Sequence, residues 1–315
     1  EPGEAGNGTK YGVDASLHAA LLRHWRDEYD WRKHEAHLNS LRQFRLSVRG
    51  VLLHFVHERS RVPGAVPLLL LHGWPGSVYE FYKAIPKLVA PDGRALRLKH
   101  AFHVVAPSLP GYGFSEARGG INATEMARIM DELMKRLGYD RFFVQGGDWG
   151  SIVAKQMGLL PEAGCVGLHL NMHLLSNPLK VGDSTGLSLR AASYLTQVLV
   201  DLSPLGRVTM SERDSHALTR TLEYARTDSA YLYVQATKPQ SLAFGLSDSP
   251  SGLLAWIAEK LQSWSDGKGN VLNVLSKDEI ITNVMIYWVT GTIHSSMRLY
   301  YESLPIPHGK GVPQP

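Results

Sequence analysis

The chain has 315 residues, a formal net charge of +4 and 44% hydrophobic residues, which is typical of a soluble globular protein. Acidic and basic residues are interleaved, so no clustered basic patch indicates nucleic-acid binding. No apolar run reaches the roughly 18 residues of a membrane helix, and no signal peptide is visible. The single cysteine, Cys165, excludes an internal disulfide and lies in an apolar run that favours a buried small hydrophobe.

The first part of the chain predicts a tail, a helical segment and a hairpin. Residues 1–12 are rich in Gly, Glu and Asn and predict a mobile tail. Residues 15–41 carry Leu, Trp and Tyr at helical spacing. Residues 44–58 predict two strands around a tight turn.

Strands and helices then alternate. The run "VPLLLLHG" at 66–73 has the pattern of a strand covered on both faces. Apolar residues recur at helical spacing from Met126 to Leu137, with a capping box at Asn122 and Glu125 and a stop at Gly138. We expect strands at 66–73, 101–108, 141–146 and 166–171, and helices at 77–89, 122–138 and 151–160. The alternation predicts an α/β fold with a parallel, doubly wound sheet.

The alternation stops after residue 171, and residues 172–304 read as a helical cap with breaks at 182–188, 245–252 and 265–270. The predicted domains are a tail and helical segment at 1–43, a core at 44–171, the cap at 172–304 and an unstructured tail at 305–315, rich in Pro and Gly.

The motif "GGDWG" follows a strand and precedes a helix, which is the setting of a nucleophile elbow with aspartate in place of serine. Gly146 and Gly150 lie two residues either side of Asp148 and permit a sharp turn. We expect the helix dipole to keep Asp148 ionised as a nucleophile. The structural alternative is an aspartate bonding to its own backbone in a glycine turn.

A second motif, "HGWPGS" at 72–77, follows the first parallel strand. Its backbone can face the elbow and complete an oxyanion hole, and we assign the two donors as the N–H groups of Trp74 and Trp149. His72 is then a structural residue. An aspartate nucleophile attacks an sp³ carbon and forms an alkyl ester, which suits a halide or an epoxide oxygen as leaving group.

With these motifs the sequence resembles the microsomal epoxide hydrolase family, which includes the juvenile hormone epoxide hydrolases. The similar segments extend over nearly the whole chain, and "HGWPG" with "GGDWG" is a specific pair; "DWG" alone also occurs in haloalkane dehalogenases. The resemblance implies an α/β-hydrolase fold, an apolar epoxide and water as reactants, a vicinal diol as product, and no cofactor or metal.

The resemblance also implies two cap tyrosines that hydrogen-bond the epoxide oxygen and act as general acid. The segment "DSAYLYVQ" assigns the first to Tyr231, and "SSMRLYYESL" assigns the second to Tyr300, ahead of its neighbour Tyr301. For each, the alternative is a packed aromatic residue.

The family's base, a histidine held by an acid, has no counterpart in this sequence. His308 follows the cap, His173 and His294 lie within it, and none stands in a matching motif. Asn171 is an amide where some relatives carry the acid. We therefore expect a fragment or a short isoform that lacks two sheet strands, exposes an apolar edge and stops at the alkyl ester.

Two alternatives stay open: a dehalogenase, and a catalytically dead paralogue that binds apolar ligands. Animal members of the family are anchored to the endoplasmic reticulum by an N-terminal helix. The resemblance therefore implies that location for an animal parent, whereas we expect this chain alone to be soluble.

Overall fold

The structure of the protein is a computed structural model that describes residues 11–91, 100–172 and 212–304. One sheet contains all six strands of these residues: β1 Gln43–Val48, β2 Val51–Glu58, β3 Val66–Leu71, β4 Phe102–Pro107, β5 Phe142–Gly146 and β6 Cys165–Leu170. Helices of the first half are α1 Ala15–Asp27, α2 Trp31–Leu38, η1 Val78–Phe81, α3 Ile85–Val89, α4 Ala123–Arg136 and α5 Asp148–Leu159. Those of the second half are α8 Glu212–Thr227, α9 Ala230–Thr237, α10 Pro239–Asp248, α11 Pro250–Trp264, η2 Val271–Asn273, α12 Lys277–Thr290 and α13 Ile293–Ser303.

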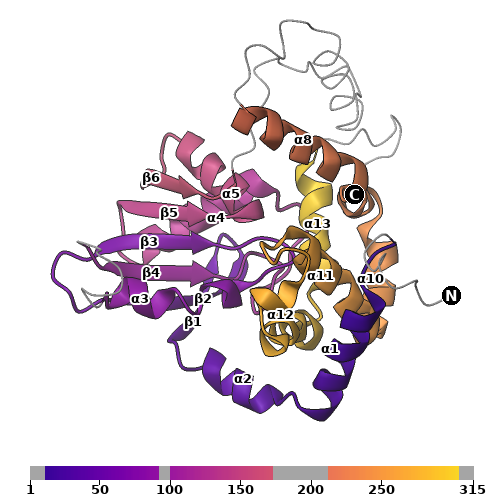
Figure 1. The fold of residues 1–315 in the computed structure, drawn as a ribbon. Helices are drawn as coiled ribbons and strands as arrows, with labels where there is room; N and C mark the ends of the chain where they lie inside the picture. The colour runs from indigo at the N-terminus through magenta and orange to yellow at the C-terminus, as the bar shows by residue number, and fades with distance from the viewer. Residues whose placement is uncertain (1–10, 92–99, 173–211, 305–315) are drawn as a thin grey trace, which may run out of the picture.

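The strand order is β1-β2-β4-β3-β5-β6, in which β1, β2 and β4 pair antiparallel and β4, β3, β5 and β6 pair parallel (Figure 1). The predicted α/β fold is confirmed, with an antiparallel hairpin added at one edge. That hairpin turns at Arg49 and Gly50, which both have positive φ. The carboxyl ends of β3 and β4 point toward the helices of residues 212–303 (Figure 1).

Strand β3 is covered on both faces, as its apolar run predicts. Leu69 and Leu71 belong to the hydrophobic cluster that contains α4 and α5. Leu68 and Leu70 belong to the opposite cluster, with η1 and α3. Each face therefore buries alternate leucines, and the layers fix the end of β3 from which the second motif begins.

The helix expected at 77–89 is two short elements instead, η1 and α3. A continuous helix would leave the ring of Pro86 against the carbonyl of Tyr82, and proline supplies no N–H to the ladder. Pro86 stands in the first turn of α3, where that N–H has no helical partner to lose.

Helix α4 agrees with its sequence pattern. The Asn122 side chain accepts from the Glu125 N–H at 3.0 Å, and Gly138 has φ +85°. The predicted capping box is only half formed, because the Glu125 carboxylate accepts from Arg49 Nε at 2.9 Å. The apolar face of α4 is buried against the sheet and α5.

The helices after residue 211 differ from prediction in one break. The break expected at 245–252 shrinks to Ser249, because α10 runs to Asp248 and Pro250 begins α11. The Ser249 side chain caps α11 by accepting from the Gly252 N–H at 3.0 Å. Residues 265–270 contain no helix or strand, as predicted, whereas 182–188 lie outside the described residues.

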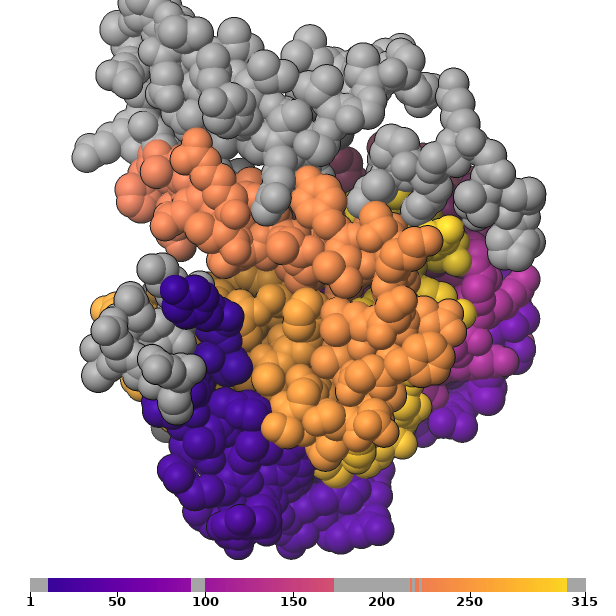
Figure 2. All heavy atoms as spheres, turned by 90° about the vertical axis from the view of Figure 1, so that its right-hand side faces the viewer, coloured from indigo at the N-terminus to yellow at the C-terminus, as the bar shows by residue number. Residues whose placement is uncertain are grey.

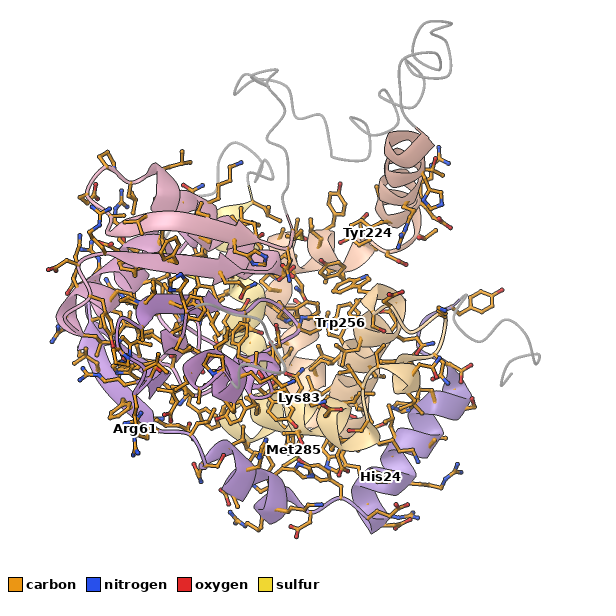
Figure 3. The ribbon with its side chains drawn as sticks, turned by 60° about the vertical axis from the view of Figure 1, so that its left-hand side comes forward. His24, Arg61, Lys83, Tyr224, Trp256 and Met285 are labelled. Atoms are coloured by element: carbon orange, nitrogen blue, oxygen red, sulfur yellow. The ribbon has the colours of Figure 1, made fainter. Side chains whose placement is uncertain are left out.

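The N-terminal helices pack directly against the helices near the other end of the described chain (Figure 2). His24 Nε2 of α1 lies 2.6 Å from Asp278 Oδ1 of α12, and His18 Nε2 lies 3.1 Å from the Ser251 carbonyl. His24 marks this contact in Figure 3. The helical segment predicted at 15–41 is therefore two helices, α1 and α2, of which α1 braces α11 and α12. No helix in the described segments has both the length and the apolar character of a membrane span.

Candidate active site

Asp148 lies at the junction of β5 and α5, with its backbone at φ +48°. A left-handed φ is strained for aspartate, and such strain is concentrated at functional sites. The helix begins at Asp148 itself, earlier than the expected start at Ser151. The sharp turn thus directs the carboxyl group out from the carboxyl end of β5.

The flanking glycines are required by close backbone approach. A Cβ on Gly150 would overlap the carbonyl of Leu71, and a Cβ on Gly146 would overlap the carbonyl of Gly150. A third glycine, Gly73, lies against the Asp148 carboxyl group. Only glycine fits at these positions, so the turn, β3 and the second motif form one compact unit.

The two assigned backbone donors converge on the Asp148 carboxyl group. The Trp74 N–H donates to Oδ1 at 2.7 Å, and the Trp149 N–H also hydrogen-bonds the carboxylate. These donors therefore face the oxygen on which charge would develop when a carboxyl ester at this position is attacked.

Helix α12 holds the loop that carries Trp74. Asn283 Nδ2 donates to the Pro75 carbonyl at 2.7 Å, and its Oδ1 accepts from Ser77 Oγ at 2.9 Å. Tyr287 Oη donates to the Gly76 carbonyl at 2.5 Å. With these carbonyls bound on the α12 side, the Trp74 N–H is turned toward Asp148.

The charge state of Asp148 depends on desolvation and on its two backbone donors. Its removal from bulk water raises its pKa to about 6, although the bonds from Trp74 and Trp149 act in the opposite direction. Asp148 is therefore ionised at neutral pH, as expected, although its pKa lies above the ordinary value because desolvation outweighs the donors. The group is ionised above about pH 6.

A second carboxyl group, Glu80, was not singled out by the sequence pattern. Its Oε1 occupies the space that a side chain on Gly76 would need. Glu80 is an exposed residue overall, so water offsets part of the desolvation that, with the charge of Asp148, raises the pKa of its carboxyl group. Glu80 thus places a second titratable group within electrostatic range of Asp148.

Both predicted tyrosines are buried close to the loop of Trp74. Tyr231 is 6% exposed and stacks on the Trp74 ring, with centroids 5.4 Å apart. Tyr300 is 2% exposed and packs edge-on against Trp149 at 4.9 Å and Tyr231 at 5.8 Å. Desolvation, followed for Tyr300 by the Asp148 charge, raises the pKa of both phenols, so both are neutral donors. Tyr301 is only partly buried.

The hydroxyls of these two tyrosines differ in their partners. Within the described residues, Tyr300 Oη is buried without a hydrogen bond of regular geometry, although the side chains of Trp149 and Tyr231 come close enough to interact with it. Tyr231 Oη lies 3.2 Å from the hydroxyl of Tyr224 on α8. Both tyrosines thus line one aromatic wall near Asp148, and Tyr231 is also paired with Tyr224.

Three other residues of this wall were missed. Trp264 packs against Tyr231 with centroids 4.9 Å apart and against Tyr224 at 6.3 Å. The Lys260 ammonium lies 5.3 Å from the centroid of the Tyr231 ring. Figure 3 labels Tyr224 on α8, and Trp256 on α11, the helix that also carries Lys260 and Trp264. No sequence motif marks them, because their shared environment is created by packing between helices.

His72, which follows β3, makes structural hydrogen bonds through both ring nitrogens. The Leu109 N–H donates to His72 Nε2 at 3.1 Å, so Nδ1 carries the proton and donates to the Gly73 carbonyl at 3.0 Å. Burial lowers the pKa of His72 to about 4. His294 packs against Phe244 at 5.2 Å. His173 and His308 lie outside the described residues.

Two further expectations concern β6 and its end. Cys165 is half-buried rather than buried, and desolvation raises the pKa of its thiol, which disfavours a reactive thiolate. Asn171 lies against Gly147, next to the elbow, where a Cβ on that glycine would lie 2.6 Å from Asn171 Oδ1. Its side chain is an amide, which supplies no negative charge to a base.

Comparison with known proteins agrees with this geometry. The family model "Epoxide hydrolase N terminus" matches residues 1–81, and "alpha/beta hydrolase fold" matches residues 66–288. A putative epoxide hydrolase of Stigmatella aurantiaca is 40% identical over 93% of this chain and 61% of its own length. Epoxide hydrolase 1 of Sus scrofa is 39% identical over 96% of this chain and 66% of its own. The chain thus spans slightly less than two thirds of these curated relatives.

Solved structures give the same result. Juvenile hormone epoxide hydrolase from the silkworm Bombyx mori superposes with a TM-score of 0.82 at 37% identity, covering 96% of this chain and 70% of that chain. The epoxide hydrolase of Aspergillus niger superposes with a TM-score of 0.76 at 31% identity, with the same coverage of 96% and 70%. These matches extend over nearly the whole chain and agree with the strained Asp148 between its glycines. The chain belongs to the epoxide hydrolase family of α/β-hydrolase-fold proteins.

Proposed function

We propose that the protein opens apolar epoxides through an ester on Asp148. A carboxylate oxygen of Asp148 bonds to one ring carbon, the bond from that carbon to the ring oxygen breaks, and a tyrosine supplies the proton that the oxygen gains. Tyr231 and Tyr300 are the donors to that oxygen. The observation that supports this most is their burial beside Trp74 and Trp149, whose N–H groups bind Asp148.

The second step is attack of water on the ester carbonyl, with Trp74 and Trp149 as the oxyanion hole. It releases a vicinal diol and needs a base. His72 has both ring nitrogens bonded, and no described histidine is hydrogen-bonded to Asp148. We therefore propose that this stretch of chain forms the ester faster than it hydrolyses it.

We also propose the domain division 1–43, 44–171, 172–304 and 305–315, in which the helices of the third part cover the site as a cap. Residues 1–10, 173–211 and 305–315 of this division lie outside the described residues. Attachment of a longer animal parent to the endoplasmic reticulum stays a proposal from the resemblance, and cell fractionation of that parent tests it.

Intact mass spectrometry after incubation with styrene oxide tests the reaction, beside Asp148→Asn and Tyr231→Phe. We expect an adduct of one substrate mass, absent in Asp148→Asn and slower in Tyr231→Phe. Halide release from a chloroalkane, with no styrene oxide adduct, would favour the dehalogenase instead. Retention of unchanged epoxide by the folded protein would favour a binding protein.

A further inference from the structure

A buried lysine, Lys260 of α11, lies within the aromatic wall that contains Tyr231. This lysine is 6% exposed, and its ammonium forms an ion pair with the carboxylate of its neighbour Glu259. Lysine side chains usually extend to keep the charged end in water, because an ammonium loses its hydration on burial. The carboxylate and the surrounding rings therefore replace water around this ammonium.

Three aromatic rings lie close to the Lys260 ammonium. Its Nζ is 5.3 Å from the centroid of the Tyr231 ring, 4.8 Å from that of Trp256 and 5.8 Å from that of Trp264. All three distances lie within the range of a cation–π attraction, which is stronger where the cation is desolvated. One of the three rings is thus that of a proposed proton donor.

The spacing of residues on α11 explains why this cation faces Tyr231. Trp256, Lys260 and Trp264 are four residues apart and therefore share one face of the helix. Trp256 Nε1 donates to Gln235 Oε1 at 3.4 Å, and Gln235 lies one turn after Tyr231 on α9. Successive turns of α11 thus bind successive turns of α9 through their side chains.

The plane of the Tyr231 ring decides where its proton is donated, because a phenol O–H lies close to the ring plane and hydrogen bonds weaken when bent. The ring stacks on Trp74 with centroids 5.4 Å apart and an interplanar angle of 9°. Stacking is favourable over a range of offsets. The 3.2 Å contact between the hydroxyls of Tyr231 and Tyr224 allows the ring to rotate about the axis through its hydroxyl. An ammonium attracted to the ring face opposes that rotation.

We propose that Lys260 is a positioning residue that holds the ring of Tyr231 in the plane required for proton donation to the epoxide oxygen. The proposal rests on the proposed function, in which Tyr231 is one of the two donors. The ring is then held by the indole of Trp74, whose N–H binds Asp148, and by the ammonium on α11. Lys260 itself gives up no proton and forms no bond to the substrate.

The test is the rate of adduct formation from styrene oxide under single-turnover conditions, followed by intact mass spectrometry. Lys260→Met keeps a long side chain without the charge and should lower the maximum rate roughly three- to thirtyfold, as expected for loss of one desolvated cation–π attraction. Lys260→Arg keeps a cation that packs on ring faces and should recover most of the rate. The half-saturating epoxide concentration should not change, because Lys260 does not bind the substrate.

Glu259→Gln is the matched control, since it removes the carboxylate partner and leaves the ammonium beside its three rings. It should leave the rate unchanged, whatever its effect on stability. In the Tyr231→Phe background, Lys260→Met should cause no further slowing, because the proton of that donor is already absent. Lys260→Gln is a second uncharged variant, which replaces Lys260→Met if the latter does not fold.

Three results would each overturn the inference alone: an unchanged rate in Lys260→Met, equal slowing in Glu259→Gln, or equal slowing with and without the hydroxyl of Tyr231. A Lys260→Arg variant as slow as Lys260→Met would also overturn it, since the charge would then not be what holds the ring. The absence of an Asp148-dependent adduct in wild type would overturn the proposed function as well.

Discussion

The side-chain amide of Asn283 donates to the carbonyl of Pro75 at 2.7 Å and ties α12 to the loop whose Trp74 N–H contacts Asp148. The same side chain accepts from Ser77, so one residue bonds two positions of that loop. Helix α12 thus helps to hold Trp74, whose N–H is one of the two proposed oxyanion-hole donors, although none of its residues donates to Asp148 among the bonds described.

Replacement of Asn283 should affect both stability and reaction. Asn283→Ala removes two buried hydrogen bonds and leaves a buried carbonyl unpaired, which should cost about 2–3 kcal/mol in the free energy of unfolding. Adduct formation should slow as well, because the Trp74 N–H loses its fixed direction. Asn273→Ala, which breaks a 2.9 Å bond to the Gly267 carbonyl outside the site, should lower stability without slowing the adduct. Urea unfolding and mass spectrometry measure the two effects.

The rate of ester formation should rise with pH through the Asp148 pKa of about 6, since only the carboxylate attacks carbon. Quenched time points between pH 4.5 and 8, analysed by intact mass, give the profile. Glu80→Gln removes the neighbouring carboxyl group and should leave the limb near pH 6 in place. A rate that is flat from pH 4.5 to 8 contradicts the assignment of Asp148.

Asp148→Asn should stabilise the fold at neutral pH. The folded-state pKa is raised from 3.8 to about 6, so the folded protein binds the proton more tightly than the unfolded chain. The carboxyl group's contribution is favourable below about pH 4 and is lost as pH rises through 6. We expect a gain of about 1–2 kcal/mol at pH 7.5 and almost none at pH 4. Thermal melts of wild type and Asp148→Asn at both pH values measure the gain. An equal difference in stability at the two pH values would contradict the prediction.

Two glycine-to-alanine substitutions should change the stability of the fold in opposite directions. Gly150→Ala drives a Cβ into the Leu71 carbonyl and should destabilise the fold by at least about 2 kcal/mol. Gly245→Ala lies in α10 with no atom within 4 Å of the new Cβ and should stabilise by about 0.5–1 kcal/mol. Chemical denaturation of both variants tests the pair, with the free energy of unfolding compared at the same dependence on denaturant concentration. A neutral Gly150→Ala would show that the turn can open.

The sequence predicts those features that depend on neighbouring residues. The strands, helix α4 and the Asp148 turn follow from periodicity and glycine spacing, and their bounds agree within a few residues. The break before α3 was also readable, because Pro86 forbids a continuous helix. The raised pKa of Asp148 was not predictable, because it depends on desolvation by residues distant in sequence. Tyr224 was missed because its partner lies across a helix boundary, although their spacing of seven residues is a faint signal.

The contact between α1 and α12 has a consequence for synthesis on the ribosome. His24 and Asp278 are 254 positions apart, so α1 has to wait for its partner until most of the described chain has been made. Contacts of such long range are formed late, after loop closure has been achieved at an entropic cost. The N-terminal helices should therefore be accessible to a chaperone or protease for most of translation. The loop of Trp74 acquires its α12 support in the same late step.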